Sequence, residues 1–221
     1  TDSWITPLMQ SVMGDNGAWV LVYTSAIMAI LRFYAGPIVH KLSPLGLLAA
    51  SSAVACVGLV ALSGATGAMM IFVAATFYAF GKTFFWPTML GVVSEQFPKG
   101  GALSLNAMGG VGMLGVGVVG AQFLGLFQDQ TVEKQLAAEQ PAIHEKIIDD
   151  KEGVFGAYKA VSPEKKADLS EEEATALAAV EAAAPQATLK TTAIFPAIML
   201  ACYLLIIFYF RGRGGYKPVE I

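Results

Sequence analysis

Charged residues are scarce in this sequence: Asp, Glu, Lys and Arg make up 14% of its 221 residues, against about 25% in an average soluble domain. The net charge is −3, and no basic cluster is interleaved with aromatic residues. These two features exclude nucleic-acid binding. No Ser-His-Asp or Cys-His set can be assembled either, so neither an enzyme nor a cofactor is expected.

Histidine and cysteine are scarcer still, with two residues of each type. His144 is followed by Glu145 but has no second histidine at metal-ligand spacing, so a solvated helix face is expected there and not a metal site. Cys56 and Cys202 lie in apolar runs, where a thiol packs as a small hydrophobe. The two cysteines therefore say nothing about the redox compartment.

Apolar residues are abundant, at 55% of the chain with a mean hydropathy of +0.59. Five stretches approach the roughly 20 apolar residues that cross a bilayer. They cover residues 18–35, 45–62, 68–93, 103–127 and 191–210. The sequence therefore predicts an all-α, polytopic membrane helix bundle.

Residues 128–190 differ sharply from the rest, because they hold 13 of the 17 acidic and 7 of the 14 basic residues. This composition predicts a soluble helical insertion. Its first part is expected to be a helix interrupted near Pro141 and running on to about Lys151. Three apolar residues share one side of this helix: Leu136, Ile143 and Ile147.

The second half of the insertion carries the start signal of a helix. Ser170 is followed three residues later by Glu173, which is the spacing of a capping box. An alanine-rich body follows, and Pro185 is expected to end the helix.

Lysine and arginine residues predict the orientation, because short cytoplasmic loops are enriched in them. They occur after the first, third and fifth apolar stretches and are absent from the "SGATGA" loop; they are Arg32, Lys41, Lys99, Arg211, Arg213 and Lys217. We therefore expect a multi-pass protein of the inner (plasma) membrane, with a cytoplasmic C-terminus and an extracytoplasmic insertion. The opening "TDSWITPLMQ" has neither an initiator Met nor a signal pattern, so we expect it to lie inside a longer protein.

The loop "RFYAGPIVHKLSPLG" carries Arg32, Gly36, His40 and Lys41. These charges can anchor the topology at the inner membrane surface. The loop also resembles, in degenerate form, the G-x-x-x-[DR]-x-x-G-[RK] signature of the major facilitator superfamily. It lacks the acidic residue and the second glycine of that signature, which weakens a gating salt bridge here.

The resemblance extends to the order of the helices and implies the second six-helix half of such a transporter. Residues 1–127 would hold the end of helix seven and helices eight to eleven, 128–190 an extracytoplasmic insertion, and 191–221 helix twelve with a cytoplasmic tail. The implied function is secondary active transport of a sugar-like or other small solute by alternating access, coupled to a proton or ion. Implied partners are the solute, protons, the bilayer and the N-terminal half. The alternative is a non-transporting membrane protein whose insertion docks a partner.

The stretch "FYAFGKTFFWPTMLG" places Lys82 near the middle of the third apolar span. Three interpretations are open: an anchor that reaches for water, a group that binds solute or takes part in proton coupling, and one half of a salt bridge to the absent N-terminal half. Pro87 should break the helix by freeing the carbonyl of Thr83. Phe85 and Trp86 are expected either to offer stacking surface to a solute or to pack between helices, which is the more common use of aromatic residues.

The fourth span is rich in glycine. Its two G-x-G-x-x-G strings lie inside a membrane span and lack the strand that precedes a dinucleotide site, so no nucleotide is expected. Gly117, Ala121 and Gly125 recur every fourth residue and predict a small-residue face for close helix packing, with bending during transport as a second use. Asn106 should face protein or a cavity.

Overall fold

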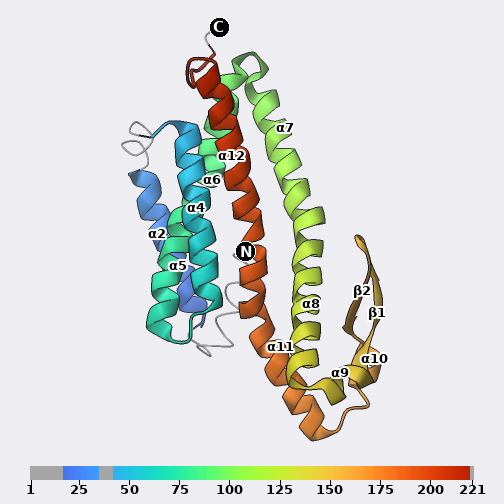
Figure 1. Ribbon diagram of the computed structural model, residues 1–221. Coiled ribbons are helices and arrows are strands. Elements are labelled where there is room, and N and C mark those ends of the chain that lie inside the picture. Colours follow the sequence, from blue (N-terminus) through green and yellow to red (C-terminus); the bar gives the residue numbers. More distant parts are fainter. Residues whose placement is uncertain (1–16, 35–41, 220–221) are drawn as a thin grey trace. The chain divides into compact units, whose positions relative to one another are not determined.

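The computed structural model describes residues 17–34 and 42–219. The chain divides into two compact units, one formed by residues 1–114 and 193–221 and the other by residues 115–192. In the first unit the elements are α2 (Gly17–Phe33), α4 (Pro44–Ser63), α5 (Ala68–Thr83), α6 (Phe85–Gln96), the short turn η2 (Pro98–Gly100), α7 (Gly101–Leu114) and α12 (Ile194–Gly212) (Figure 1).

Four continuous helical segments are long and apolar enough to cross a membrane. Within the described part of the chain they are Pro44–Ser63, Ala68–Gln96, Pro98–Glu139 and Glu171–Gly212. A fifth apolar helix, Ala18–Phe33, is shorter. The fold thus has the helices of a membrane protein, and they coincide with the five apolar stretches of the sequence.

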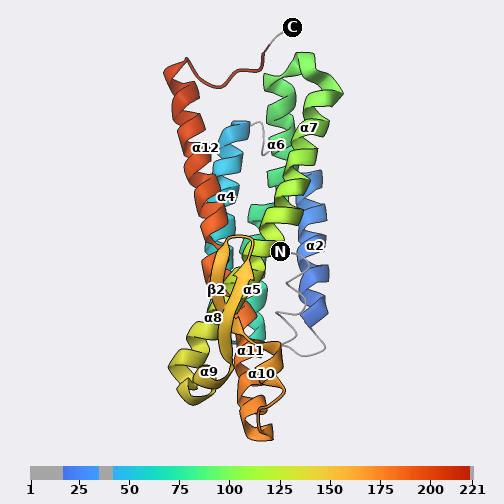
Figure 2. The same cartoon turned by 90° about the vertical axis from the view of Figure 1, so that its right-hand side faces the viewer.

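Helices α4 and α5 form the centre of the first unit. α4 begins at a proline, and the Ser43 side chain caps it by accepting a hydrogen bond of 3.1 Å from the backbone N–H of Gly46. α4 also packs against α12 and α6. The turn between α4 and α5 lies at one end of this unit, and the turn between α6 and α7 lies at the other end together with the C-terminal tail (Figures 1 and 2).

The predicted helix break is present at Phe84, which separates α5 from α6. Pro87 is the third residue of α6, where a missing N–H costs nothing because the first turn has no intrahelical acceptor. The helical segment Glu171–Gly212 has the same construction, since Ala193 separates α11 from α12 and Pro196 is the third residue of α12. Each proline thus marks a break three residues before it.

The second unit holds a stretch of π-helix, η3 (Gly115–Gly120), followed by α8 (Ala121–Glu139), α9 (Pro141–Ile147), β1 (Ile148–Gly153), β2 (Gly156–Val161), α10 (Pro163–Lys166) and α11 (Glu171–Thr192). Its core is an apolar cluster from α8, α9 and α11: Val132, Leu136, Ile143, Ile147, Leu177, Val180 and Ala184. The predicted interruption near Pro141 and the shared face of Leu136, Ile143 and Ile147 are confirmed.

Two predictions for this unit were wrong. Residues 148–151 form a strand and not helix, because β1 pairs with β2 in an antiparallel hairpin with Gly153 opposite Gly156. Gly156 has a φ of +109°, a conformation that only glycine adopts readily. The fold is therefore mainly but not purely α-helical.

The second wrong prediction concerns Pro185, which does not end α11. A proline inside a helix removes the hydrogen bond to the carbonyl four residues earlier, at a cost of about 3 kcal/mol. Ala184, Thr188 and Leu189 are all buried on either side of it. Their packing holds the helix together across the proline.

Candidate functional site

Lys82 is the central residue of the helical segment Ala68–Gln96, with fourteen residues on either side. At about 1.5 Å per residue, roughly 21 Å of helix separates it from each end. Its side chain is half-buried, and its Nζ lies 5.1 Å from the ring centroid of Tyr78, one turn earlier on α5. Tyr78 is itself buried. A cation over an aromatic face in a desolvated place gains about 2 kcal/mol.

The backbone beside Lys82 is pressed against α4. A Cβ atom at Gly81 would overlap the backbone of Ala55, and one at Gly58 would lie 2.5 Å from the backbone nitrogen of Tyr78. Both glycines therefore allow a contact that no larger residue permits. The contact fixes the segment of α5 that carries Lys82.

The break after Lys82 is buried and lined by a hydroxyl. Thr83 is fully buried, and its Oγ1 donates a hydrogen bond of 2.5 Å to the carbonyl of Ala79. Such a bond to the preceding turn satisfies the hydroxyl and bends the helix. Beyond the break, the backbone N–H of Thr88 donates to the carbonyl of Phe84 at 3.1 Å, which starts the ladder of α6.

One turn of α4 contacts α5 one turn before its break and also contacts the break that precedes α12. Ala55 meets Gly81, and its neighbour Cys56 donates a weak hydrogen bond from Sγ to the carbonyl of Ala193 at 3.6 Å. The same carbonyl accepts a hydrogen bond of 3.2 Å from the backbone N–H of Ala197, so it starts the ladder of α12 as Phe84 starts that of α6. We call this group, Ala55, Cys56, Gly81, Lys82, Phe84 and Ala193, the paired-break site.

The charge of Lys82 has no acidic residue near it in sequence. No Asp or Glu occurs between Asp15 and Glu95, and Glu95 lies thirteen residues further along the same helical segment, about 20 Å away. A charge at this depth in a membrane costs about 2.5 to 3.5 kcal/mol on insertion scales. An ammonium group can attract an anion, pair with a carboxylate, donate hydrogen bonds to a hydroxyl-rich group or transfer a proton.

The predicted aromatic pair lies on the first turn of α6. Phe85 is half-buried, whereas Trp86 is 43% exposed. Trp86 faces α7, because a Cβ at Gly112 would lie 3.2 Å from its ring. Asn106 is exposed and lies six residues from Gly112 along α7, about 9 Å away. Trp86 thus contacts the glycine-rich helix α7 at Gly112, and Asn106 lies nearly two turns away from that contact on the same helix.

The remaining predicted residues lie away from the paired-break site. Arg32 is exposed in the last turn of α2, and Gly36 and Lys41 fall outside the described residues. Gly117 and Ala121 are exposed, and no atom of a described residue lies within 4 Å of a Cβ placed on Gly117 or Gly125. The predicted small-residue face therefore has no packing partner in the described chain, and its role stays a prediction.

Sequence reasoning missed the close contact of α4 with α5. The signal was present in "SSAVACVG", where Ser51, Ala55 and Gly58 are spaced by four and three residues along one helix face.

The C-terminal tail is bound to the end of α6. The Tyr216 hydroxyl donates to Glu95 Oε2 at 2.6 Å, the backbone N–H of Val219 donates to the Glu95 carbonyl at 2.9 Å, and Gln96 Nε2 donates to the Lys217 carbonyl at 2.9 Å. Burial and the neighbouring Glu95 carboxylate raise the pKa of Tyr216 to about 12. The tail is thus held at the end of the unit where the basic residues gather.

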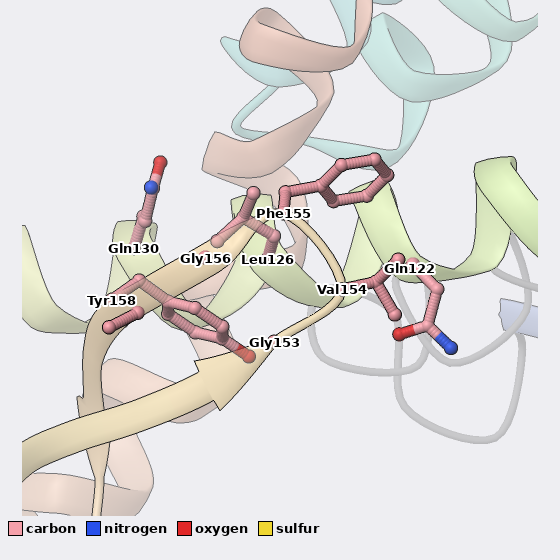
Figure 3. A pocket seen from close by; sticks show the side chains of 9 residues that line it. Gln122, Leu126, Gln130, Gly153, Val154, Phe155, Gly156 and Tyr158 are labelled. Atoms are coloured by element: carbon pink, nitrogen blue, oxygen red, sulfur yellow. The ribbon is translucent and has the colours of Figure 1, made fainter.

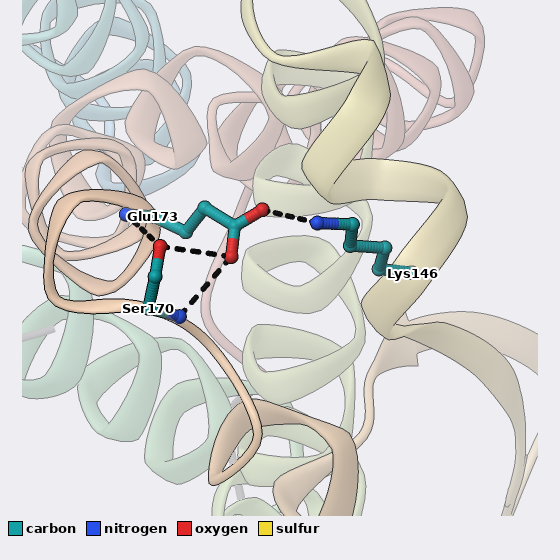
Figure 4. Close-up of polar contacts among 3 residues, drawn as sticks. All are labelled: Lys146, Ser170 and Glu173. Carbon is teal, nitrogen blue, oxygen red and sulfur yellow. Dashed lines mark hydrogen bonds and ion pairs between the residues drawn. The ribbon is translucent and has the colours of Figure 1, made fainter.

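The second unit holds several ion pairs at its surface. The predicted capping box is confirmed: Ser170 Oγ accepts from the backbone N–H of Glu173, and the Glu173 carboxylate accepts from the Ser170 N–H (Figure 4). Lys146 also donates to Glu173. The Lys146 ammonium and the Ser170 donors lower the pKa of Glu173 to about 2.

His144 serves in this unit as a structural partner. One of its ring nitrogens, Nε2, lies 3.0 Å from Glu133 Oε1 on α8, which ties α9 to α8. Among the residues that the structure describes, no group of three or more His, Cys, Asp or Glu side chains could hold a metal ion.

No protein-family model, no curated protein and no solved structure matches this chain. The function is therefore inferred from the chain's own sequence and geometry.

Proposed function

We propose that this chain is the second half of a major facilitator-type transporter that moves a small solute across a membrane by alternating access. The observation that carries the proposal is Lys82, a cation at the centre of a membrane-length helix and directly before a break in it. Transporters place binding sites at mid-membrane beside broken helices, where freed backbone groups and an unusual charge can meet a solute.

The paired-break site also supplies a means of movement. Two helices that contact one turn of α4 are interrupted at that contact or within one turn of it, so each can bend there without losing further backbone hydrogen bonds. In this proposal α4 is the support, and the halves of the Ala68–Gln96 segment tilt about Phe84. Lys82 then changes its exposure to the two sides of the membrane.

The solute class follows from the chemistry of Lys82. An ammonium group with a tyrosine beneath it suits an anionic or hydroxyl-rich metabolite, and proton or ion coupling supplies the driving force. Uptake into proteoliposomes by the full-length protein tests the proposal, with a panel of sugars, nucleosides, organic anions and amino acids under an imposed proton gradient. Accumulation of one class supports transport, and no flux for any of them contradicts it.

A second candidate function rests on the second unit, which has its own apolar core and its own set of ion pairs. A self-contained unit of this kind suits a docking domain on a membrane anchor. Thr131 Oγ1 and Thr188 Oγ1 lie 3.2 Å apart, so a short Gly-Ser linker can replace residues 132–187 without straining the helices.

The two candidates predict different results for that deletion. Loss of a bound partner with flux retained assigns docking as a side function of a transporter. If neither the intact nor the shortened protein transports any solute, and the shortened one loses its partner, the chain is a docking protein.

A further inference from the structure

The hairpin of the second unit has an apolar turn on polar strands. Its strands carry Asp149, Asp150, Lys151 and Glu152, whereas its two-residue turn is Val154 and Phe155. Val154 is 72% exposed and Phe155 is 48% exposed. Two adjacent exposed apolar residues at the turn of a charged hairpin offer a small apolar surface.

The hairpin runs along α8 toward the apolar start of that helix. At its base, Asp129 accepts hydrogen bonds of 2.9 Å from Lys151 Nζ and from the Tyr158 hydroxyl. At its turn, the Phe155 ring stacks on Phe123, with centroids 4.1 Å apart and an angle of 22° between the planes. The turn closes over α8 beside Gln122 (Figure 3).

Two independent lengths agree with this alignment. Asp129 and Phe123 are six residues apart on α8, which is about 9 Å of helix. Lys151 and Val154 are three residues apart in extended chain, which is about 10 Å. The polar base therefore lies level with Asp129, and the apolar turn lies level with Phe123.

Phe123 belongs to the fourth apolar stretch, 103–127, about 6 Å inward from its end at Phe127. Asp129 lies just beyond that end. An apolar group at this depth sits at the boundary between lipid headgroups and acyl chains, where interfacial segments bury about 5 to 10 Å. The two strands have unpaired outer edges, which cannot enter the hydrocarbon core, so only the turn inserts.

We propose that the hairpin turn Val154–Phe155 is a membrane-interface anchor that seats in the lipid of the leaflet next to the second unit. The lipid bilayer is the occupant because the α8 segment against which the turn packs continues the membrane-length apolar helix Pro98–Glu139. The inference rests on that helix crossing the membrane and not on transport.

Depth-dependent fluorescence quenching tests this anchor in the full-length protein reconstituted in phosphatidylcholine vesicles. Cys56→Ser and Cys202→Ala remove the native thiols, and Val154→Cys carries an environment-sensitive dye. Glu152→Cys, two residues earlier on the same exposed hairpin, is the matched control. Both positions are solvent-exposed within the chain, so the labels leave the fold intact.

Lipids with a nitroxide near the headgroup should quench the dye at 154 several-fold more strongly than the dye at 152, and its emission should shift to the blue. Aqueous iodide should quench the two dyes in the opposite order. Equal lipid quenching at the two positions would overturn the proposal. A dye at 154 that is shielded from both quenchers would also overturn it, because a protein surface would then cover the turn.

Discussion

Two helix pairs in this molecule differ in how closely their backbones approach. α4 and α5 meet through Gly58 and Gly81, with backbone against backbone, whereas α8 and α11 meet through Leu136, Leu177 and Val180. In a bilayer, moving an apolar side chain from lipid to a helix interface gives no hydrophobic free energy, so helices associate through close van der Waals packing. In water, burial of leucine and valine supplies the free energy. The contrast is what we expect if the first pair lies in lipid and the second lies in water.

The largest expected stability effect is at the centre of the second unit. Leu136 is fully buried, so Leu136→Ala should lower the free energy of unfolding by about 2 to 5 kcal/mol through lost burial and a residual cavity. Limited proteolysis of the full-length protein should then cut within residues 115–192. Leu205→Ala, at a position 68% exposed, is the control and should leave the cleavage pattern unchanged. If both variants resisted proteolysis equally, the apolar core of the second unit would not be what stabilises it.

The next effect is at the glycine contact of the first unit. Gly81→Ala should lower the free energy of unfolding by about 1 to 3 kcal/mol, because the added methyl group pushes α5 away from Ala55. Gly91→Ala, where no atom lies within 4 Å of the added Cβ, is the matched control and should not destabilise. Thermal unfolding midpoints in detergent compare the two. If Gly91→Ala proved the more damaging, α4 and α5 would not be in backbone contact.

Sequence reasoning identified most helices of both regions because hydrophobic length and helical spacing are local signals. The capping box at Ser170 and the break before Pro87 likewise depend on only a few adjacent residues. The hairpin was missed because β1 consists mostly of charged residues, which do not favour a strand. It is stabilised by pairing with β2 and by the hydrogen bond from Lys151 to Asp129 on α8. Pro185 was misjudged because tertiary burial around it outweighs a local cost. Such long-range terms are invisible in one stretch of sequence.

The same limit applies to the paired-break site. Lys82 and Pro87 stood out in the sequence because each conflicts with its surroundings. Ala55, Cys56 and Ala193 did not, since a small residue in an apolar helix is ordinary until another helix is laid against it. The approach of two interrupted helices to one turn of α4 is a property of packing alone.

The smallest expected effect on stability is electrostatic and concerns the Glu173 carboxylate on the surface of the second unit. Glu173 has a pKa of about 2 in the fold, below its ordinary value of 4.5. The ionised carboxylate therefore contributes stability that is fully present above pH 4.5 and is lost as the pH falls toward 2.

Hydrogen exchange at the first turn of α11 measures this loss. Between pH 4.5 and 2, protection in the wild type should fall more steeply than in Glu173→Gln, which cannot titrate. Glu171→Gln, a neutralised acid in the same turn, should keep the wild-type slope. A Glu173→Gln variant with the wild-type slope would show that other groups govern this pH range.

The central claim is that Lys82 works as a functional charge at mid-membrane. The most direct test is uptake by the full-length protein in proteoliposomes with Lys82→Met, which keeps much of the side-chain length and removes the charge, and with Lys82→Arg, which keeps the charge. We expect Lys82→Met to insert into the membrane at the wild-type level and to abolish uptake, and Lys82→Arg to retain part of it. Wild-type uptake by Lys82→Met would contradict the assignment of the site.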